Sequence, residues 1–221
     1  VFSQTFNTDL PGGVIYNPLH TETLETVTPA DLRRLMNVRP DCRLIYIPSA
    51  GVAMKGKRYV FEIIRRLSES GNVAFFLSGN IDQDLAVELG MLQSDAVIFA
   101  PGHAEYKDNL KYVAACDFGI SPTLIENLSG AIIEGLTLGL PFVTFDTGGN
   151  KEIVHDGVNG FVIPYLDVDE IVSKARLLLE NRDLLNEMKL RSSEPLSAKF
   201  DSQNSLAQYL EVFDLLRTNG R

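Results

Sequence analysis

The sequence has few of the residues on which several classes of protein depend. Its 221 residues include no tryptophan, three histidines and two cysteines. Cys42 and Cys116 lie too far apart to form a metal-binding motif, and the histidines at positions 20, 103 and 155 lack the spacing of metal ligands. We therefore expect no metal site, and we interpret both cysteines as buried thiols of a reducing compartment.

Long hydrophobic runs and an excess of basic residues are also missing. No segment approaches the roughly 18 uninterrupted apolar residues of a membrane span, and no signal peptide is visible. Lys and Arg number 20 against 29 Asp and Glu, so the formal net charge is −9. This balance disfavours a nucleic-acid-binding protein, and it disfavours this chain as the main contact with an anionic membrane.

Short apolar runs alternate with helical patterns along most of the chain, which predicts βαβ units. Strands are expected at residues 43–47, 73–77, 96–99, 118–121, 142–145 and 160–163. Helices are expected between them at residues 57–70, 82–92, 106–115, 129–138 and 151–155, and at the end of the chain at 168–180, 183–191 and 202–217. The pattern indicates an α/β fold with a Rossmann-like parallel sheet, helices on both faces and additional C-terminal helices.

Three parts of the chain are expected from this pattern. Residues 1–27 form an entry segment with a possible short strand at Val14–Tyr16, residues 28–200 form the Rossmann-like domain, and residues 201–221 form a last helix. Thr28, followed by a proline, is the expected cap of the first helix.

Ligands of such sheets bind beyond the carboxyl ends of the strands. The loops at that edge are residues 48–57, 79–81, 100–105, 122–129 and 146–151. His103, on the third of these loops, is a possible ligand contact.

Glu126 and Glu134 are the most informative pair of residues at this edge. Glu134 is the only ionisable side chain between Leu128 and Val143, in an otherwise apolar helical segment. An unpaired buried carboxylate is costly, so a protein group or a ligand should pair with it. The free N–H groups at the start of that helix suit a phosphate. Two hydroxyl acceptors beside an anion site indicate a nucleotide-sugar pocket.

The loop after the first core strand has the sequence Pro48-Ser-Ala-Gly-Val-Ala-Met-Lys-Gly-Lys-Arg58, which suits a diphosphate. It also nearly matches a P-loop through Gly51, Gly56 and Lys57, but Arg58 replaces the hydroxyl that would bind magnesium. The P-loop therefore remains a minor alternative.

Further motifs follow in order along the chain: Ala114-Ala-Cys-Asp-Phe-Gly-Ile-Ser-Pro122, Gly148-Gly-Asn-Lys-Glu152 and Asp156-Gly-Val-Asn-Gly160. Together with the glutamate pair they resemble the C-terminal, donor-binding domain of retaining GT-B glycosyltransferases of the large family called glycosyl transferases group 1. The resemblance covers about residues 12–218. It implies one half of a GT-B fold, whose other half is an N-terminal acceptor domain.

The resemblance also implies a role for each matching residue. Glu126 would be the catalytic residue, lying near the reacting carbon and contacting hydroxyls of the donor sugar. Glu134 would bind the ribose, while Lys55 and Gly56 would hold the leaving diphosphate. Backbone N–H groups near Leu128, Ser129 and Gly130 would bind the same diphosphate. No cofactor or metal is implied, because cations and a helix end take up the charge.

The implied reaction moves a hexosyl or N-acetylhexosaminyl group, with retention, from a nucleoside-diphosphate sugar to a glycan or glycolipid. This activity belongs to polysaccharide or lipopolysaccharide biosynthesis, in the cytoplasm and peripherally at the inner membrane face. We expect no transfer by this chain without its acceptor domain.

One departure from the family favours a different function. The family has an arginine five residues before the lysine, where this chain has Ala50; Lys57, Arg58 or Lys151 would have to compensate. The alternative is therefore a weak or inactive glycosyltransferase-like binding subunit. A nucleotide-sugar epimerase of the same fold is a further, less favoured alternative.

Overall fold

The computed structural model describes residues 14–18, 23–24, 26–92, 96–192, 196, 200 and 202–219. The chain divides into two compact units, which are described separately below. One comprises Glu22–Leu196, and the other comprises Val1–Thr21 with Ser197–Arg221. The expected division at residues 27/28 and 200/201 stays a prediction.

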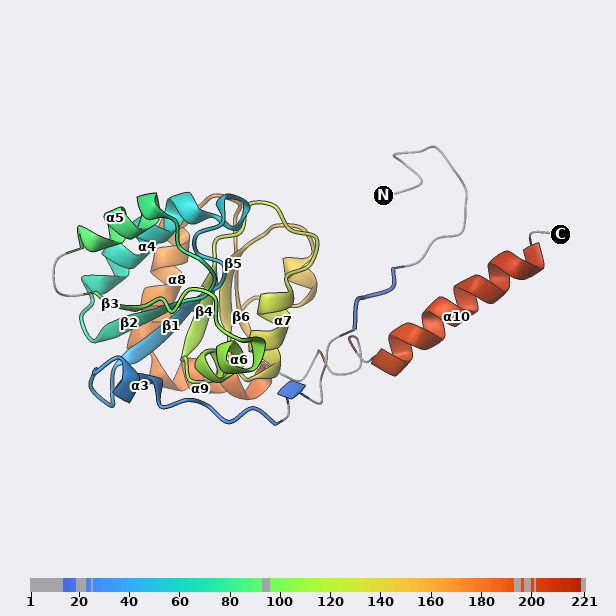
Figure 1. Cartoon of the computed structure of the whole chain (residues 1–221), viewed down its shortest axis with the longest axis horizontal. Coiled ribbons are helices and arrows are strands. Elements are labelled where there is room, and N and C mark those ends of the chain that lie inside the picture. The colour runs from blue at the N-terminus through green and yellow to red at the C-terminus, as the bar shows by residue number, and fades with distance from the viewer. Residues whose placement is uncertain are drawn as a thin grey trace. The chain divides into compact units, whose positions relative to one another are not determined.

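The larger unit is built on one parallel sheet of six strands in the order β3-β2-β1-β4-β5-β6 (Figure 1). The strands are β1 (Arg43–Ile47), β2 (Val73–Leu77), β3 (Val97–Phe99), β4 (Phe118–Ser121), β5 (Phe142–Phe145) and β6 (Gly160–Ile163). All five strand pairings are parallel. The predicted strands and the predicted Rossmann-like sheet are therefore confirmed.

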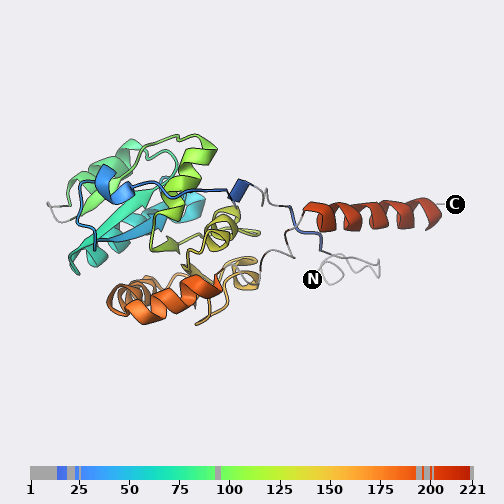
Figure 2. The same ribbon diagram turned by 90° about the horizontal axis from the view of Figure 1, so that it is seen from below.

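Helices cover both faces of this sheet, as Figures 1 and 2 show. They are α3 (Leu32–Leu35), α4 (Lys57–Ser68), α5 (Gln83–Gly90), α6 (Tyr106–Ala114), α7 (Gly130–Thr137), α8 (Val168–Glu180) and α9 (Arg182–Arg191), with short 3-10 turns η1 (Ala53–Lys55) and η2 (Asn150–Glu152). On one face α4 packs against α8, and on the other α6 packs against α7. Residues of the strands other than the half-buried edge strand β3 are almost all buried, which explains why these strands are continuous apolar runs rather than alternating ones.

Close packing fixes α7 against the sheet. The ring of Phe142 on β5 lies where a Cβ would stand at Gly119 on β4 or at Gly135 on α7. Glycine at both positions lets the helix approach the strands, and this holds the start of α7 at the carboxyl edge. The helix ends at Thr137, followed by Gly139 in the left-handed region at φ 79°.

Three local predictions are wrong. Asp31, not Thr28, caps α3, because its carboxylate accepts the N–H of Arg34 at 3.2 Å. The helix expected at 151–155 is only the 3-10 turn η2, which lies between the glycine turn and a second turn. Residues 14–18 form no strand in the described part of the chain.

The smaller unit contains α10 (Ser202–Asn219), which confirms the helix predicted at 202–217. The hydroxyl of Ser205 donates to the carbonyl of Tyr16 at 2.9 Å, and the rings of Tyr16 and Phe200 meet edge-on at 5.3 Å. Most of residues 1–27 lie outside the described residues. No helix in the described ranges has the length and apolar character needed to cross a bilayer.

Candidate functional site

Two loops meet at the carboxyl edge of the sheet, one after β1 and one after β4. The carbonyl of Met54 accepts the N–H groups of Leu124 and Ile125, at 2.9 and 3.2 Å. Gly56, two residues after Met54, has φ 87°, and a Cβ there would overlap the carbonyl oxygen of Pro122. Glycine is therefore required at this position for the two loops to touch.

The glycine turn after β5 supports the second loop from its other side. The N–H of Gly149 donates to the carbonyl of Asn127 at 2.6 Å. A Cβ at Gly148, which has φ 55°, would overlap the carbonyl of Glu126. The Gly-Gly motif thus fixes the backbone that carries Glu126, and it does so by backbone contact.

Lys55 and Glu126 form an ion pair between these loops. The side chain of Glu126 is 12% exposed and that of Lys55 is 31% exposed. The other carboxylate oxygen, Oε1, lies 3.2 Å from the N–H of Asn127. Two residues that sequence reasoning placed in one site are therefore in direct contact.

The start of α7 lies directly after this loop. Ser129 is its cap, with Oγ accepting the N–H of Ile132 at 3.4 Å. Within the described ranges, no acceptor is found for the N–H groups of Leu128, Ser129 and Gly130. Gly130 is exposed and has open space around it. Free N–H groups at a helix N-terminus carry partial positive charge and suit an anion.

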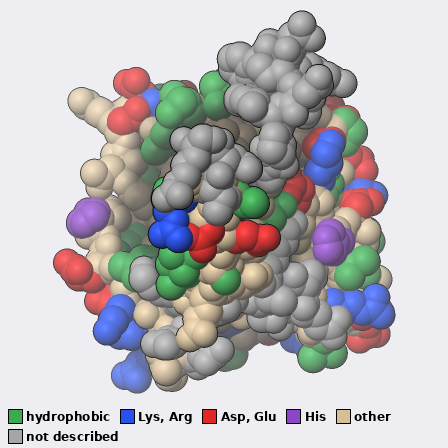
Figure 3. All heavy atoms as spheres, turned by 90° about the vertical axis from the view of Figure 1, so that its right-hand side faces the viewer, with side chains coloured by type: hydrophobic (Ala, Val, Ile, Leu, Met, Phe, Trp, Pro, Cys, Tyr) green, Lys and Arg blue, Asp and Glu red, His purple; other side chains and the backbone are tan. Residues whose placement is uncertain are grey.

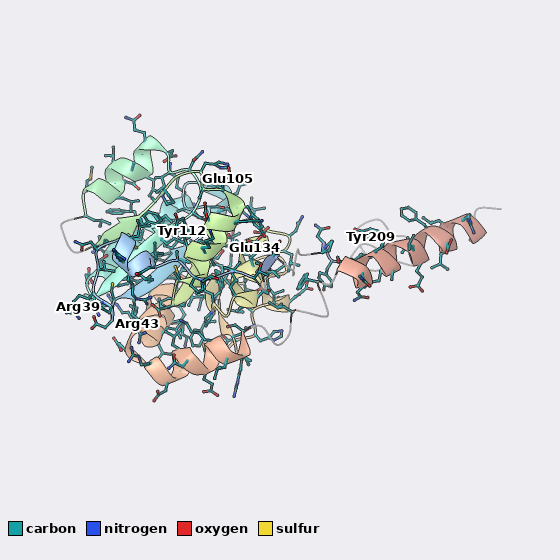
Figure 4. All side chains as sticks on the ribbon, turned by 60° about the horizontal axis from the view of Figure 1, so that its bottom comes forward. Arg39, Arg43, Glu105, Tyr112, Glu134 and Tyr209 are labelled. Atoms are coloured by element: carbon teal, nitrogen blue, oxygen red, sulfur yellow. The ribbon has the colours of Figure 1, made fainter. Side chains whose placement is uncertain are left out.

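Glu134 is labelled in Figure 4 and lies one turn further along α7. Its spacing of four residues places it on the same face of the helix as Gly130. It is partly buried, and its Oε1 accepts the hydroxyl of Tyr106 on α6 at 2.9 Å. Burial raises the pKa of the Glu134 carboxyl, while the Tyr106 hydrogen bond lowers it. The predicted pairing of this carboxylate is thus by a phenol.

This arrangement has two carboxylates with different partners on either side of free N–H groups. It can accept hydroxyls at two places and hold an anion between them. Known proteins resemble this chain in both sequence and fold. Residues 42–181 match the family model described as glycosyl transferases group 1.

This chain belongs to that family.

Its relatives include the sulfoquinovosyl transferase SQD2 of Arabidopsis thaliana, 29% identical over 162 residues, which are 68% of this chain and 29% of the relative. The putative glycosyltransferase EpsD of Bacillus subtilis is 22% identical over 88% of this chain and 52% of its own length. The chain therefore spans at most about half of these relatives.

Among solved structures, HepE of Anabaena in complex with UDP and glucose superposes with a TM-score of 0.77 at 23% identity. The match covers 92% of this chain and 57% of that one. The fold is thus one half of a GT-B glycosyltransferase, as the sequence predicted.

Ala50 occupies the position at which the family has an arginine. Its side chain is completely buried in the hydrophobic core, and its N–H donates to the carbonyl of Ser78 at 3.2 Å. The position therefore faces the protein interior in this chain, not the free edge.

The three cations suggested as replacements all have other partners. Lys57 pairs with Asp82, at the start of α5. Lys151 lies 3.3 Å from Asp146. The guanidinium of Arg58 stacks over the ring of Tyr59, at 4.6 Å from its centroid. In the described residues, Lys55 is the cation that pairs with a site carboxylate.

Sequence reasoning missed Tyr106. The residue stands at the first position of an expected helix, and nothing in its spacing relative to Glu134 indicates contact, because the two are 28 residues apart. His103 is exposed on the loop after β3, and no hydrogen bond joins it to either glutamate within the described residues.

Other surface features do not compete with this site. A cavity of about 500 Å³ lies at the opposite, amino edge of the sheet, between Arg43, Asn72 and Arg182. Asp41 and Glu180 also line it, so its charge is mixed. On the face shown in Figure 3, basic side chains are scattered among acidic and hydrophobic ones. Within the described ranges, no three His, Cys, Asp or Glu side chains group as metal ligands.

Proposed function

We propose that this chain is the donor-binding half of a retaining glycosyltransferase that uses a nucleoside-diphosphate sugar. One observation carries the proposal: Glu126 and Glu134 flank the free N–H groups at the start of α7, and Lys55 reaches the same place. The solved relative HepE, which is described with UDP, supports a nucleoside diphosphate as the ligand.

Each residue then has a chemical role. The N–H groups of Leu128, Ser129 and Gly130 hold the diphosphate, and Glu134 accepts the ribose hydroxyls. Lys55 neutralises the charge that develops on the diphosphate as its bond to the anomeric carbon breaks. Glu126 contacts the sugar beside that carbon. The acceptor hydroxyl bonds to the same face, and its proton leaves with the diphosphate.

The acceptor belongs to a second, N-terminal domain in this proposal. Hexosyl or N-acetylhexosaminyl transfer to a glycan or glycolipid, at the inner membrane face, is part of the same proposal. The chemistry then takes place in a cleft between two domains, so this chain alone binds donor and transfers nothing. Sustained sugar transfer by the isolated chain would refute this part.

The second candidate is a glycosyltransferase-like binding subunit. Ala50 favours it, because a buried alanine leaves the leaving group with one cation, Lys55. The preserved glutamates favour an enzyme. Replacing Glu126 by Ala in a protein that includes the acceptor domain distinguishes them, since only an enzyme would lose turnover.

The first experiment is thermal stabilisation of the chain by UDP, GDP, ADP, TDP and ATP, each with EDTA or with magnesium. A ligand that binds only the folded state adds about 2.7 kcal/mol at a hundredfold excess over Kd. We expect one diphosphate to stabilise the chain in EDTA, which would support a metal-independent site and identify the base.

Other outcomes point elsewhere. Stabilisation only by ATP with magnesium would favour the P-loop alternative at Gly51–Lys57. No stabilisation by any nucleotide would contradict the donor site in this chain and favour the binding subunit.

A further inference from the structure

Within the described residues, the ionisable groups that interact with Glu134 are the phenols of Tyr106 and Tyr46. Its Oε1 accepts the Tyr106 hydroxyl at 2.9 Å, and it forms no ion pair within the described residues. The hydroxyl of Tyr46, on β1, is buried. Burial raises the pKa of Tyr46, and the negative charge of Glu134 raises it further. Glu126 contrasts with it, because Lys55 neutralises that carboxylate.

A carboxylate with this one hydrogen bond can accept further hydrogen bonds from a ligand. Ionised carboxylate oxygens offer about four acceptor sites, and Tyr106 fills one. A protonated carboxyl accepts fewer hydrogen bonds. Burial favours the protonated form, and only a donor that stabilises the charge opposes it.

We propose that Tyr106 is a positioning residue for nucleoside recognition: its hydroxyl keeps Glu134 ionised and fixes one oxygen, so that the other accepts the ribose diol of the donor. This inference rests on the proposed function, and it adds a residue to it. Tyr106 is 44% exposed at the start of α6, so it lies at the rim from which a ligand would approach.

The phenol is suited to this role over the whole physiological range. Burial, and after it the charge of Glu134, raises the pKa of Tyr106, so that its hydroxyl stays protonated. Among the described residues, α6 and β4 pack against α7, and so does β5 through Phe142; β5 carries no titratable side chain. From α6 the group that affects the titration of Glu134 is Tyr106, and β4 carries no titratable side chain.

The test compares Tyr106→Phe with Tyr112→Phe on the same helix. Tyr112 packs against Phe99 at 5.1 Å between ring centroids, and Figure 4 labels it and Glu134 on α6 and α7. Affinities of both variants and of the wild type are measured for UDP, GDP and ADP, and for their 2′-deoxy forms, between pH 5 and 8. The Glu134 carboxyl is also titrated by NMR without ligand.

We expect Tyr106→Phe to weaken binding of the preferred diphosphate about tenfold at pH 7, which is about 1.4 kcal/mol, because Glu134 loses the donor that fixes one oxygen and favours its ionised form. The preference for ribose over deoxyribose should shrink in the same variant. The loss of affinity on acidification should begin at a higher pH, and the NMR titration of Glu134 should move upward. Tyr112→Phe should match the wild type in all four respects.

The two proposals fail in different ways. If no nucleoside diphosphate binds the wild type, the proposed function fails and this inference falls with it. If a diphosphate binds the wild type and Tyr106→Phe equally, with the same ribose preference and pH dependence, Tyr106 has no positioning role and the donor site stands.

Discussion

Lys55 and Glu126 form an ion pair that joins the loop after β1 to the loop after β4. The lysine belongs to η1, and the glutamate precedes α7 by four residues. Both side chains are substantially buried, at 31% and 12% exposed. In the proposed function an incoming diphosphate competes with Glu126 for this cation, so binding and the release of Glu126 toward the sugar are coupled.

The first prediction concerns this cation. Lys55→Met should weaken binding of the stabilising diphosphate by about ten- to a hundredfold, because a charged hydrogen bond of 1.5–3 kcal/mol is lost. Lys57→Met is the matched control, since Lys57 is two residues away and pairs with Asp82 instead. Titration calorimetry of both variants gives the comparison. Equal losses would mean that the loop binds the diphosphate only through its overall charge.

Much of this architecture could be predicted from the sequence because the strands are buried on both faces. Strands such as Val73–Leu77 are continuous apolar runs, and they alternate with helical patterns. Glu134 could be identified as a site residue because it is a charged side chain in an apolar segment. Its environment could not be predicted, because the Tyr106 contact depends on how α6 packs against α7.

The same limit applies to Ala50 and to the first cap. Sequence spacing places Ala50 at the family's arginine position, and only the packing of the loop shows that the side chain enters the core. Thr28 and Asp31 are both good caps, and the choice depends on where the chain turns toward α3. The glycine turn indicates a close approach of the backbone, but that its partner is the carbonyl of Glu126 could be seen only in the structure.

A second prediction tests the requirement for glycine between the two loops. Gly56→Ala should destabilise the chain and weaken diphosphate binding, because it combines a positive φ with overlap on Pro122. Gly71→Ala is the control, since Gly71 has φ 64° but open space around it. The control should cost about 1 kcal/mol of unfolding free energy and leave binding unchanged. Chemical denaturation measures the free energy of unfolding, and calorimetry measures diphosphate binding. Equal losses of stability and of affinity in the two variants would show that the contact with Pro122 does not make glycine necessary at position 56.

A third prediction concerns stability at the amino edge. Asp117 is buried at the start of β4, where Arg33 donates to it at 2.6 Å and the N–H of Leu44 at 2.8 Å. Lys189 lies 3.4 Å away. Asp117→Asn should cost about 3 kcal/mol, because removing one partner leaves buried charge uncompensated.

The control for this variant is Asp41→Asn, which breaks the exposed pair between Asp41 and Arg39. Exposed pairs contribute little, so its urea midpoint should match the wild type. A midpoint for Asp117→Asn equal to that of this control would show that Asp117 does not hold the edge together.

The last prediction follows from the burial of Glu134. Burial raises the pKa of this carboxyl in the folded state. Its contribution to stability is therefore fully present below the unfolded pKa, about 4.3, and is lost as pH rises through the folded value. At neutral pH the charged side chain opposes folding. Glu134→Gln should then be more stable than the wild type at pH 7, and the difference should vanish near pH 4.

Melting temperatures of both proteins across this range measure the effect, and a gain of 1 kcal/mol corresponds to about 2–4 °C for a chain of this size. The variant should at the same time bind the nucleoside diphosphate less tightly, because Tyr106 holds one Glu134 oxygen and an amide has no second oxygen to accept the ribose hydroxyls. If Glu134 serves to bind the nucleoside diphosphate, Glu134→Gln should raise the stability of the fold and lower the affinity for this ligand. A variant less stable than the wild type at pH 7 would instead show that the fold itself compensates the Glu134 carboxylate.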